Sequence, residues 1–341
     1  MRVLVTGGAG YIGSHAAKRL LSLGHEVLIV DDLSRGTGDA VETLRGWAAE
    51  SGCGERLWFE RARVQEEARL GALLRERAVE AVMHFAAFAY VDESIERPLE
   101  YHENNAWGAL ALLRACAGTG VERFVLSSTC AVYGAPGDAP VTERTPCAPI
   151  TPYGWSKLYA ERVGTDALVG AQREGRAFAF AALRYFNVAG CDHEGVLGER
   201  LEGCRRLIPN LVRSALAGEA ALKVYGDDYE TRDGTCVRDF VHVDDLVEAH
   251  VLTLGALEPA RHDLRTYNVG TGEGVSVLEA ARAVERVLGR GVRLERVGRR
   301  PGDAPSLVAD ASLIARELGW EARSSEMGAI VETVARWQMA K

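Results

Sequence analysis

The first thirty residues alternate between apolar and mixed stretches in a way that predicts a strand, a helix and a second strand. Residues 3–5 are an unbroken apolar run, which is typical of a strand buried on both faces. Apolar side chains then recur every three or four residues and predict a helix that ends at Gly24; they are Ile12, Ala16, Leu20 and Leu23. Residues 27–30 predict the second strand, which ends at Asp31. Together these segments form one βαβ unit.

Three glycines lie in the turn between the first strand and the helix. Gly7, Gly10 and Gly13 have the spacing GxxGxxG, in which glycine lets the backbone turn tightly and approach a pyrophosphate. Such turns also occur without a ligand, but here a strand, a helix N-terminus and Asp31 surround the glycines as in dinucleotide-binding units. The Asp31 carboxylate would bind ribose hydroxyls and repel a 2′-phosphate, which favours NAD over NADP, although Arg35 lies nearby.

The alternation of strands and helices continues to about residue 187. Residues 32–56 read as a loop with a short helix. Strands are then predicted at 57–64, 81–85, 123–128 and 178–185, and helices at 66–77, at 98–117 and from 152. This order predicts an α/β fold with a Rossmann-type, doubly wound parallel sheet.

Beyond residue 188 the pattern changes. A charge-rich loop precedes a helix at 208–217 and a strand at 223–225, whereas a helix at 244–254 and a strand at 266–269 return to the first pattern. Helices at 276–288, 311–318 and 325–338 then alternate with polar loops. We therefore expect a nucleotide-binding domain of residues 1–187, to which 239–271 return. A smaller, mixed α/β C-terminal substrate domain would consist of 188–238 and 272–341.

Composition and charge exclude several classes of protein. A chain of 341 residues with 47% hydrophobic content can bury a large core, and a net charge of −8 with scattered basic residues argues against nucleic-acid binding. No apolar run is long enough to span a membrane, and the first strand leaves no room for a signal peptide, so we expect a cytoplasmic protein. The seven cysteines and eight histidines have no zinc-ligand spacing, which predicts reduced thiols and no metal. His84, in an apolar run, is expected to be a core residue.

Tyr153 and Lys157 are four residues apart on a predicted helix, so both side chains lie on one face. An unperturbed tyrosine needs about 4 kcal/mol of phenolate stabilisation to act as a base at pH 7, and a lysine cation about 5 Å away would supply on the order of 3 kcal/mol. Thr129 follows the strand at 123–128 and can hydrogen-bond the same substrate hydroxyl, at a strand end where open α/β sheets bind ligands. The alternative is an exposed tyrosine–lysine pair without a role.

At these residues the chain resembles the extended short-chain dehydrogenase/reductase superfamily, and within it the UDP-galactose 4-epimerases. The blocks that carry the resemblance occur in order over nearly the whole chain: HFAAFAYVDES, PLEYHENN, SSTCAVYG, PYGWSKLYAE, LRYFNVAG, DGTCVRDFVHVDDL, YNVGTGEGVSV and RRPGDAPSLVAD. The resemblance implies an NAD-dependent isomerase that interconverts UDP-galactose and UDP-glucose by transient oxidation at sugar C4. It also implies a homodimer that forms through the helices near 98–117 and 152–170.

The resemblance also implies a role for individual residues. Tyr153 would be the base, Lys157 would hold the nicotinamide ribose and lower the pKa of the tyrosine, and Thr129 would assist. The residues implied to bind NAD are Gly7, Gly10, Tyr11, Ile12, Gly13, Asp31, Asp32, Leu33, Ser34, Arg35, Gly36, Arg63, Val64, Phe85, Ala86, Ala87, Asn104, Tyr153, Lys157, Tyr185 and Phe186. The residues implied to bind the UDP-sugar are Thr129, Asn187, Arg206, Leu207, Lys223, Val224, Tyr225, Arg238, Arg300, Asp303 and Leu307.

Several positions depart from the family pattern. Ala62-Arg63 stands where Gly-Asp is common, which puts a hydrogen bond to adenine in doubt, and Ala89 replaces a frequent lysine near the pyrophosphate. Arg206 replaces a frequent asparagine near the substrate phosphates. Leu307 replaces the bulky tyrosine of members that accept only plain hexoses, so we expect room for an N-acetylhexosamine; the alternative is that Leu307 only packs in the core.

Two other functions stay open from the sequence. One is a different UDP-sugar epimerase, a decarboxylase or a 4,6-dehydratase of the same superfamily; a dehydratase of this type typically carries Asp-Glu after the Ser/Thr, where this chain has Cys130-Ala131. The other is an NAD-binding regulator without catalysis, which would have little use for an intact Thr129, Tyr153 and Lys157.

Overall fold

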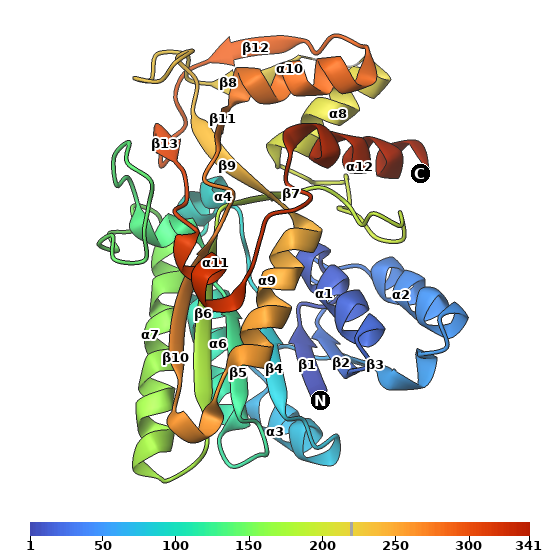
Figure 1. Cartoon of the computed structure of the whole chain (residues 1–341), viewed down its shortest axis with the longest axis vertical. Coiled ribbons are helices and arrows are strands. Elements are labelled where there is room, and N and C mark those ends of the chain that lie inside the picture. Colours follow the sequence, from blue (N-terminus) through green and yellow to red (C-terminus); the bar gives the residue numbers. More distant parts are fainter. Residues whose placement is uncertain (219–220) are drawn as a thin grey trace. The chain divides into compact units, whose positions relative to one another are not determined.

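The computed structural model describes residues 1–218 and 221–341 (Figure 1). Two compact units make up the chain. The first unit comprises Met1–Val132, Thr151–Arg184 and Val247–Tyr267, and the second comprises Tyr133–Ile150, Tyr185–Leu246 and Asn268–Lys341.

A seven-stranded sheet lies at the centre of the first unit, with the strand order β10-β6-β5-β4-β1-β2-β3. The six strands from β3 to β6 pair in parallel, and β10 forms the edge beside β6. Their bounds are Arg2–Thr6 (β1), Glu26–Asp31 (β2), Leu57–Arg61 (β3), Ala81–His84 (β4), Arg123–Ser127 (β5), Ala179–Tyr185 (β6) and Leu264–Val269 (β10). The predicted Rossmann-type α/β fold is thereby confirmed.

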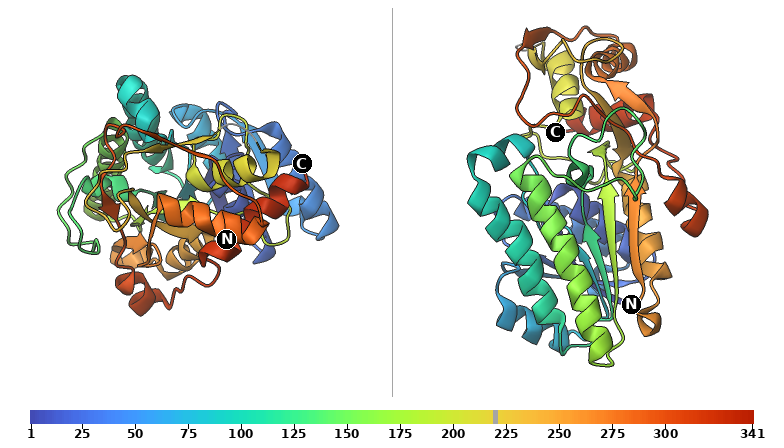
Figure 2. Two further views of the ribbon diagram at one scale, coloured as in Figure 1. Left: turned by 90° about the horizontal axis from the view of Figure 1, so that it is seen from above. Right: turned by 90° about the vertical axis from the view of Figure 1, so that its left-hand side faces the viewer.

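Helices cover the sheet of the first unit. The α-helices are Tyr11–Ser22 (α1), Gly38–Glu50 (α2), Glu67–Glu76 (α3), Val91–Glu96 (α4), Pro98–Tyr101 (α5), Gly108–Cys116 (α6), Pro152–Arg173 (α7) and Val243–Ala256 (α9). A π-helical turn at His102–Trp107 joins α5 to α6, and 3-10 turns lie at Gly54–Arg56, Cys130–Tyr133 and Pro259–Arg261. The right-hand view of Figure 2 shows α6 and α7 side by side along the sheet. Among the described residues, no helix combines the length and the apolar character that a bilayer crossing requires.

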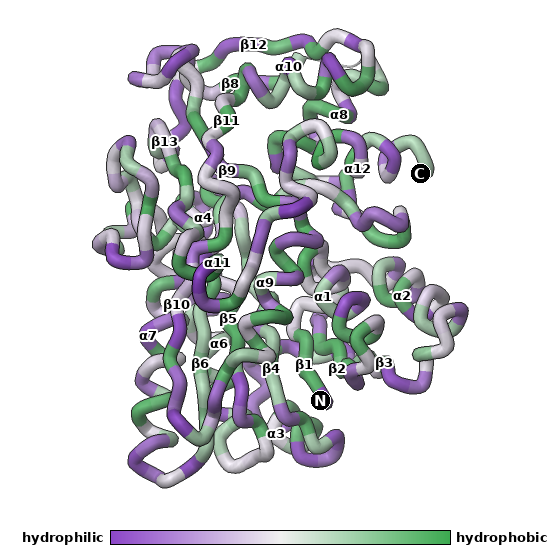
Figure 3. The backbone as a smooth tube through the Cα atoms, viewed as in Figure 1, coloured by the Kyte–Doolittle hydropathy of each residue, from purple (hydrophilic) through white to green (hydrophobic). Residues whose placement is uncertain are grey.

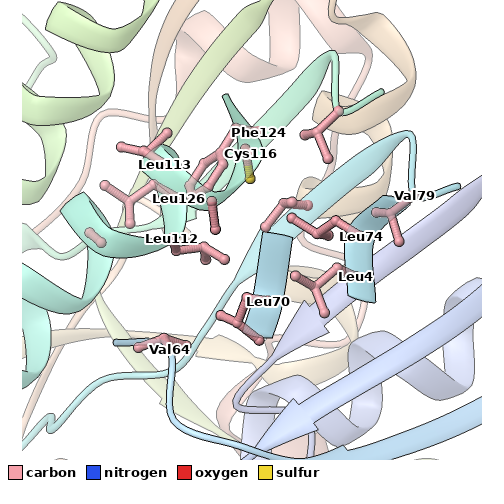
Figure 4. Close-up of a cluster of buried hydrophobic side chains, with 14 of the residues drawn as sticks. Leu4, Val64, Leu70, Leu74, Val79, Leu112, Leu113, Cys116, Phe124 and Leu126 are labelled. Carbon is pink, nitrogen blue, oxygen red and sulfur yellow. The ribbon is translucent and has the colours of Figure 1, made fainter. Parts of the chain in front are cut away.

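The core of the first unit follows from the alternation of side chains along each strand. Leu4 of β1 and Phe124 of β5 point to the face that carries α3 and α6, where they pack with Leu70, Leu74 and Leu112 in one buried cluster (Figure 4). Figure 3 shows β1 and its neighbours as largely hydrophobic. Strands that are apolar throughout are typical of a parallel sheet with both faces covered, as the sequence predicted.

The second unit is a mixed α/β structure, as expected. A four-stranded sheet has the order β11-β9-β13, with β7 also paired to β9, and β12 pairs with β8. The strands are Asn187–Ala189 (β7), Leu222–Tyr225 (β8), Val237–His242 (β9), Gly274–Ser276 (β11), Leu294–Val297 (β12) and Ser306–Leu307 (β13). The helices are Leu207–Ala217 (α8), Val277–Leu288 (α10), Ser312–Leu318 (α11) and Met327–Met339 (α12). Helices α8, α10 and α12 pack around a core that includes Leu211, Val284 and Ile330.

Three local predictions in the first unit were wrong. The segment after Asp31 contains a 13-residue helix, α2, where a loop with a short helix was expected; the Thr37 hydroxyl caps it by accepting the Ala40 N–H at 3.3 Å. Leu23 lies beyond the end of α1 and is exposed rather than part of its apolar face. The third strand ends at Arg61 instead of residue 64.

The boundaries between the two units also differ from the predicted domain boundaries. Residues 133–150, 185–187, 239–246 and 268–271 belong to the second unit, although all were expected in the first. The reason is strand pairing: β9 pairs with β7, β11 and β13, and Val141 donates its N–H to Val308 O at 2.8 Å. Strand β9 was not predicted, because Arg238 and Asp239 interrupt its apolar residues.

Candidate active site

The glycine turn lies where the strand order of the sheet reverses. Strand β1 stands between β2 and β4, and ligands of open α/β sheets bind at such a switch point. Gly7 follows β1 with φ +70°, and a Cβ at this position would lie 2.6 Å from the backbone nitrogen of Ala86, which follows β4. The backbones of the two loops therefore approach each other as closely as glycine allows.

Helix α1 begins beside this turn, at Tyr11. Its N-cap is Gly10, so no side chain caps the helix, and a phosphate can take that place. A Cβ at Gly13 would lie 2.2 Å from the carbonyl oxygen of Gly7, so the helix packs directly on the turn. The geometry of the turn and helix therefore suits a pyrophosphate.

Asp31 ends β2 and holds the loops around the turn. One carboxylate oxygen accepts the Ala9 N–H at 3.0 Å and the other accepts the Leu33 N–H at 2.8 Å. Burial raises the pKa of Asp31, and these two backbone hydrogen bonds oppose that rise. Each oxygen keeps a further lone pair, so the carboxylate can also accept ribose hydroxyls.

The loop that follows Asp31 is tied to the segment after β4. Arg35 donates from Nη2 to the Glu93 carboxylate at 2.6 Å, and its guanidinium lies 4.8 Å from the centre of the Phe88 ring. The buried Glu93 also accepts the Tyr101 hydroxyl at 2.8 Å. Arg35 is thus engaged by a carboxylate within the unit.

Tyr153 and Lys157 lie on the first turns of α7. The Thr151 hydroxyl caps this helix by accepting the Gly154 N–H at 3.2 Å, and Pro152 occupies its first turn. Both Tyr153 and Lys157 are buried, and the Tyr153 ring meets that of Tyr101 edge-on with centroids 6.2 Å apart. The exposed-pair alternative is therefore wrong.

The Lys157 ammonium is fixed by the neighbouring strand. It donates to the carbonyl oxygen of Ser127, the last residue of β5, at 2.8 Å. Burial lowers the pKa of Lys157 to about 8, and the carboxylate of Glu161 opposes that fall. Lys157 therefore remains mostly cationic at pH 7 and can stabilise a nearby phenolate.

Thr129 follows β5 by two residues and is buried. Its hydroxyl oxygen accepts the Ala131 N–H at 3.2 Å, which leaves the hydroxyl proton to be donated. His84, at the end of β4, forms a 2.7 Å hydrogen bond with the Thr6 hydroxyl, and burial lowers its pKa to about 3. His84 is therefore the neutral core residue that the sequence predicted.

Sequence reasoning missed two polar groups next to the predicted site. Glu161 lies one further turn along α7 from Lys157, and the 153, 157, 161 spacing was the available signal. Asn105, in the π-helical turn beside the predicted Asn104, bonds to both backbone groups of Phe88 and donates to the Ser156 hydroxyl at 2.9 Å. π-Helical turns occur frequently at functional sites.

The second unit brings several of the predicted substrate residues together. The guanidinium of Arg300 lies 3.9 Å from the centre of the Tyr225 ring, on β8. Arg238, on β9, donates to the Asp303 carboxylate at 3.4 Å, and the pairing of β13 with β9 sets the half-buried Leu307 opposite Arg238. Lys223 is exposed on β8, and Val224 beside it is buried.

Other predicted residues have partners that limit their freedom. Arg206 forms an ion pair with the buried carboxylate of Glu199, immediately before Leu207 begins α8. Arg63 is exposed, and its backbone N–H donates to Glu66. The remaining predicted residues of the second unit are Tyr185, Phe186, which donates its N–H to Val269 O, and Asn187, which pairs with Phe240.

One histidine group of the second unit has a composition suited to a metal ion. Within the described ranges, His193, His242 and Asp244 are the single such group, with ligand atoms no more than 4.8 Å apart. The two imidazole rings are stacked, with planes inclined by 11° and centroids 4.8 Å apart. Ring-nitrogen lone pairs lie in the ring planes, so these nearly parallel rings do not converge on one ion.

Comparisons with known proteins agree with this geometry. The family described as GDP-mannose 4,6 dehydratase matches residues 4–333. The chain is 38% identical to UDP-glucose 4-epimerase of Lactobacillus helveticus, covering 99% of this chain and 97% of the relative. It is 43% identical to UDP-arabinose 4-epimerase 1 of Arabidopsis thaliana, covering 98% and 79%.

A solved structure extends the likeness to three dimensions. UDP-glucose-4-epimerase from Stenotrophomonas maltophila, with bound NAD and formylated UDP-arabinopyranose, has a TM-score of 0.91 and is 40% identical, covering 100% of this chain and 98% of that one. The chain therefore belongs to the family described as GDP-mannose 4,6 dehydratase, and its full-length relatives include UDP-glucose 4-epimerases.

Proposed function

We propose that this chain is an NAD-dependent UDP-sugar 4-epimerase that interconverts UDP-galactose and UDP-glucose. The observation that carries the proposal is the buried pair of Tyr153 and Lys157 on α7, with the Lys157 ammonium held on the carbonyl of Ser127. Full-length relatives that are named UDP-glucose 4-epimerase support the same activity.

The residues of the first unit account for the proton steps. Bound NAD would supply the site that takes a hydride from sugar C4 and later returns it. Tyr153, as a phenolate beside the Lys157 cation, accepts the proton of the 4-hydroxyl and gives it back after the sugar presents its other face. Thr129 donates a hydrogen bond to the same sugar oxygen. Because the proton and the hydride both return, no net oxidation results.

Two features of the first unit support NAD rather than NADP. The Asp31 carboxylate would repel a 2′-phosphate, and the nearby cation that could attract one, Arg35, is paired with Glu93 at 2.6 Å. In the second unit, Arg238 and Arg300 are the residues proposed to hold the substrate diphosphate, because planar guanidinium groups match phosphate oxygens.

Incubation of the purified protein with UDP-galactose, without added cofactor, tests the proposal. We expect UDP-glucose to form and NAD, released by denaturation, to match the protein in amount before and after turnover. Recovery of mainly NADPH, a need for stoichiometric cofactor, or a decarboxylated or dehydrated product would contradict it.

We also propose that the protein is a homodimer through the outer face of α5, the π-helical turn, α6 and α7. Large apolar side chains are exposed there: Leu99 (80%), Trp107 (54%), Tyr159 (49%) and Trp155 (40%). Trp155 and Tyr159 lie ring to ring at 5.7 Å, so they form one continuous surface. Sedimentation should give twice the chain mass for the wild type and the chain mass for Leu99→Glu/Trp107→Glu; a monomeric wild type would contradict the dimer.

Leu307 is proposed to set which sugars enter the site. It is half-buried on β13 opposite Arg238, so a larger side chain there would reduce the room beside the proposed diphosphate ligands. We expect the wild type to epimerise UDP-N-acetylglucosamine as well, and Leu307→Tyr to lower kcat/KM for this substrate about 10–200-fold while sparing UDP-galactose. Equal loss on both substrates, or no turnover of the N-acetylated sugar by the wild type, would remove Leu307 from this role.

A further inference from the structure

A buried ion pair in the first unit joins Arg184 to Glu161, which lies one helical turn along α7 from the proposed catalytic Lys157. Arg184, near the end of β6, donates from Nη2 to one oxygen of the Glu161 carboxylate at 2.6 Å and from Nε to the other at 3.0 Å. The Ser128 hydroxyl donates to the same carboxylate. All three residues are buried.

A contribution to stability alone does not explain this buried ion pair. A buried ion pair loses the hydration of both charges, and well-packed apolar residues in its place are often as stable or more stable. The Glu161–Arg184 pair nevertheless connects α7, the end of β5 and β6. These are the elements that carry Lys157 and Thr129.

Ser128 and Glu161 each link the ion pair to a proposed catalytic residue. Ser128 lies between Ser127, whose carbonyl holds the Lys157 ammonium, and Thr129. Glu161 is also one helical turn from Lys157, on the same face of α7. The Glu161 carboxylate thus both fixes the end of β5 and places a negative charge near the lysine.

On the basis of the proposed function, we infer that Glu161 is a positioning residue of the epimerase: held by Arg184, it keeps Lys157 protonated and fixes Ser128 so that Thr129 faces the substrate.

Among the charged and titratable groups around Lys157, Glu161 is the one that favours its protonated form. From its own helix, Tyr153 and Glu161 face it. From β5, the Ser127 carbonyl accepts a hydrogen bond from it, and from β6 the Arg184 cation is bonded to Glu161. His84, from β4, is neutral because its pKa is lowered to about 3, so it offers no counter-charge. The pKa of Lys157 is lowered to about 8 by burial, and Glu161 is the group that raises it.

The test is the pH profile of turnover by the NAD-loaded protein. In Glu161→Gln, Lys157 should lose its proton at lower pH, so the alkaline limb of kcat should move down by about one pH unit or more. Asp166→Asn is the matched control, because it removes a carboxylate from the outer side of the same helix, away from Lys157, where Asp166 pairs with Arg162 at 3.0 Å. Its profile should match that of the wild type.

A double variant separates positioning from a structural role. Glu161→Leu/Arg184→Met removes both charges and leaves neither buried alone, so thermal stability should return towards the wild-type value. The alkaline limb should stay displaced, because Lys157 still lacks its counter-charge. An alkaline limb of kcat that stays at the wild-type pH in Glu161→Gln, or that returns to the wild-type pH in the double variant, would overturn the inference. If Glu161→Gln does not fold, the pH profile of the double variant is the test.

A second readout needs no substrate. The tyrosinate absorbance of the NAD-loaded protein, minus that of Tyr153→Phe, follows the ionisation of Tyr153. This titration should move to higher pH in Glu161→Gln and stay in place in Asp166→Asn. A wild type that leaves UDP-sugars unchanged would refute the proposed function, whereas an unmoved tyrosinate titration would refute the role of Glu161.

Discussion

Replacement of Tyr153 by phenylalanine is expected to lower kcat for UDP-galactose by on the order of 10²–10⁴-fold. The phenylalanine ring keeps the edge-on contact with Tyr101, whose centroid lies 6.2 Å away, so the packing of α7 changes little. The variant lacks the hydroxyl that accepts and returns the proton of the sugar 4-hydroxyl. Because Lys157 still donates to the Ser127 carbonyl, NAD and UDP should bind almost as they do to the wild type.

The measurement is kcat for UDP-galactose together with the NAD content of the denatured protein and the Kd for UDP. Tyr159→Phe serves as the control, since it removes a hydroxyl from a tyrosine on the outer face of the same helix and keeps the aromatic ring, with its contacts to His102 and Trp155, that the proposed dimer surface needs. Its kcat should equal that of the wild type. Near-normal turnover by Tyr153→Phe would remove Tyr153 from the role of base.

The sequence predicted the parts of the site that depend on local order. The glycine turn, Asp31 and the tyrosine–lysine pair are each set by neighbours along the chain: a strand followed by a helix, or two residues one helical turn apart. The structure keeps these relations, with Gly7 against Ala86 and Lys157 on the carbonyl of Ser127. Local pattern is sufficient for such residues because the strand order of a parallel sheet then brings them to one edge.

Groups that act through partners distant along the chain were not predicted from the sequence. Glu161 is one of two acidic residues on α7, the other being Asp166, and nothing in the sequence sets it apart. Only the pairing of β5 with β6 brings Ser128 and Arg184 to it. Arg35 and Glu93 are 58 positions apart, so their ion pair depends on the fold of the whole unit. The sequence therefore contained these residues but gave no sign of their partners.

Short strands without a regular pattern were also missed. Strand β9 contains the buried Asp239, whose carboxylate accepts the N–H groups of Thr271, Gly272 and Ala309 at 2.8, 2.9 and 3.1 Å. A buried carboxylate that is satisfied by backbone amides breaks the apolar run from which a strand is recognised. The wrong assignment of residues 239–246 to the first unit follows from this interruption.

Replacement of Gly7 by alanine is expected to abolish the copurification of NAD and to destabilise the first unit. Gly7 has φ +70°, a conformation that costs a residue with a Cβ about 1–2 kcal/mol. The added Cβ would also lie 2.6 Å from the Ala86 nitrogen and 2.8 Å from both the Ala86 Cα and the carbonyl carbon of Phe85. These atoms are backbone, so the loop after β4 must move away from the turn that is proposed to hold the pyrophosphate.

Gly118→Ala separates the effect of the positive φ from the effect of the close approach between the two loops. Gly118 has nearly the same backbone conformation, with φ +75°, but nothing lies within 4 Å of the position of an added Cβ. This variant should lose about 1–2 kcal/mol of unfolding free energy and keep its NAD, whereas Gly7→Ala should lose more stability and release the cofactor. Thermal unfolding and the NAD-to-protein ratio after gel filtration measure the two effects. If both variants retain NAD equally, the close approach of the two loops does not form the dinucleotide site.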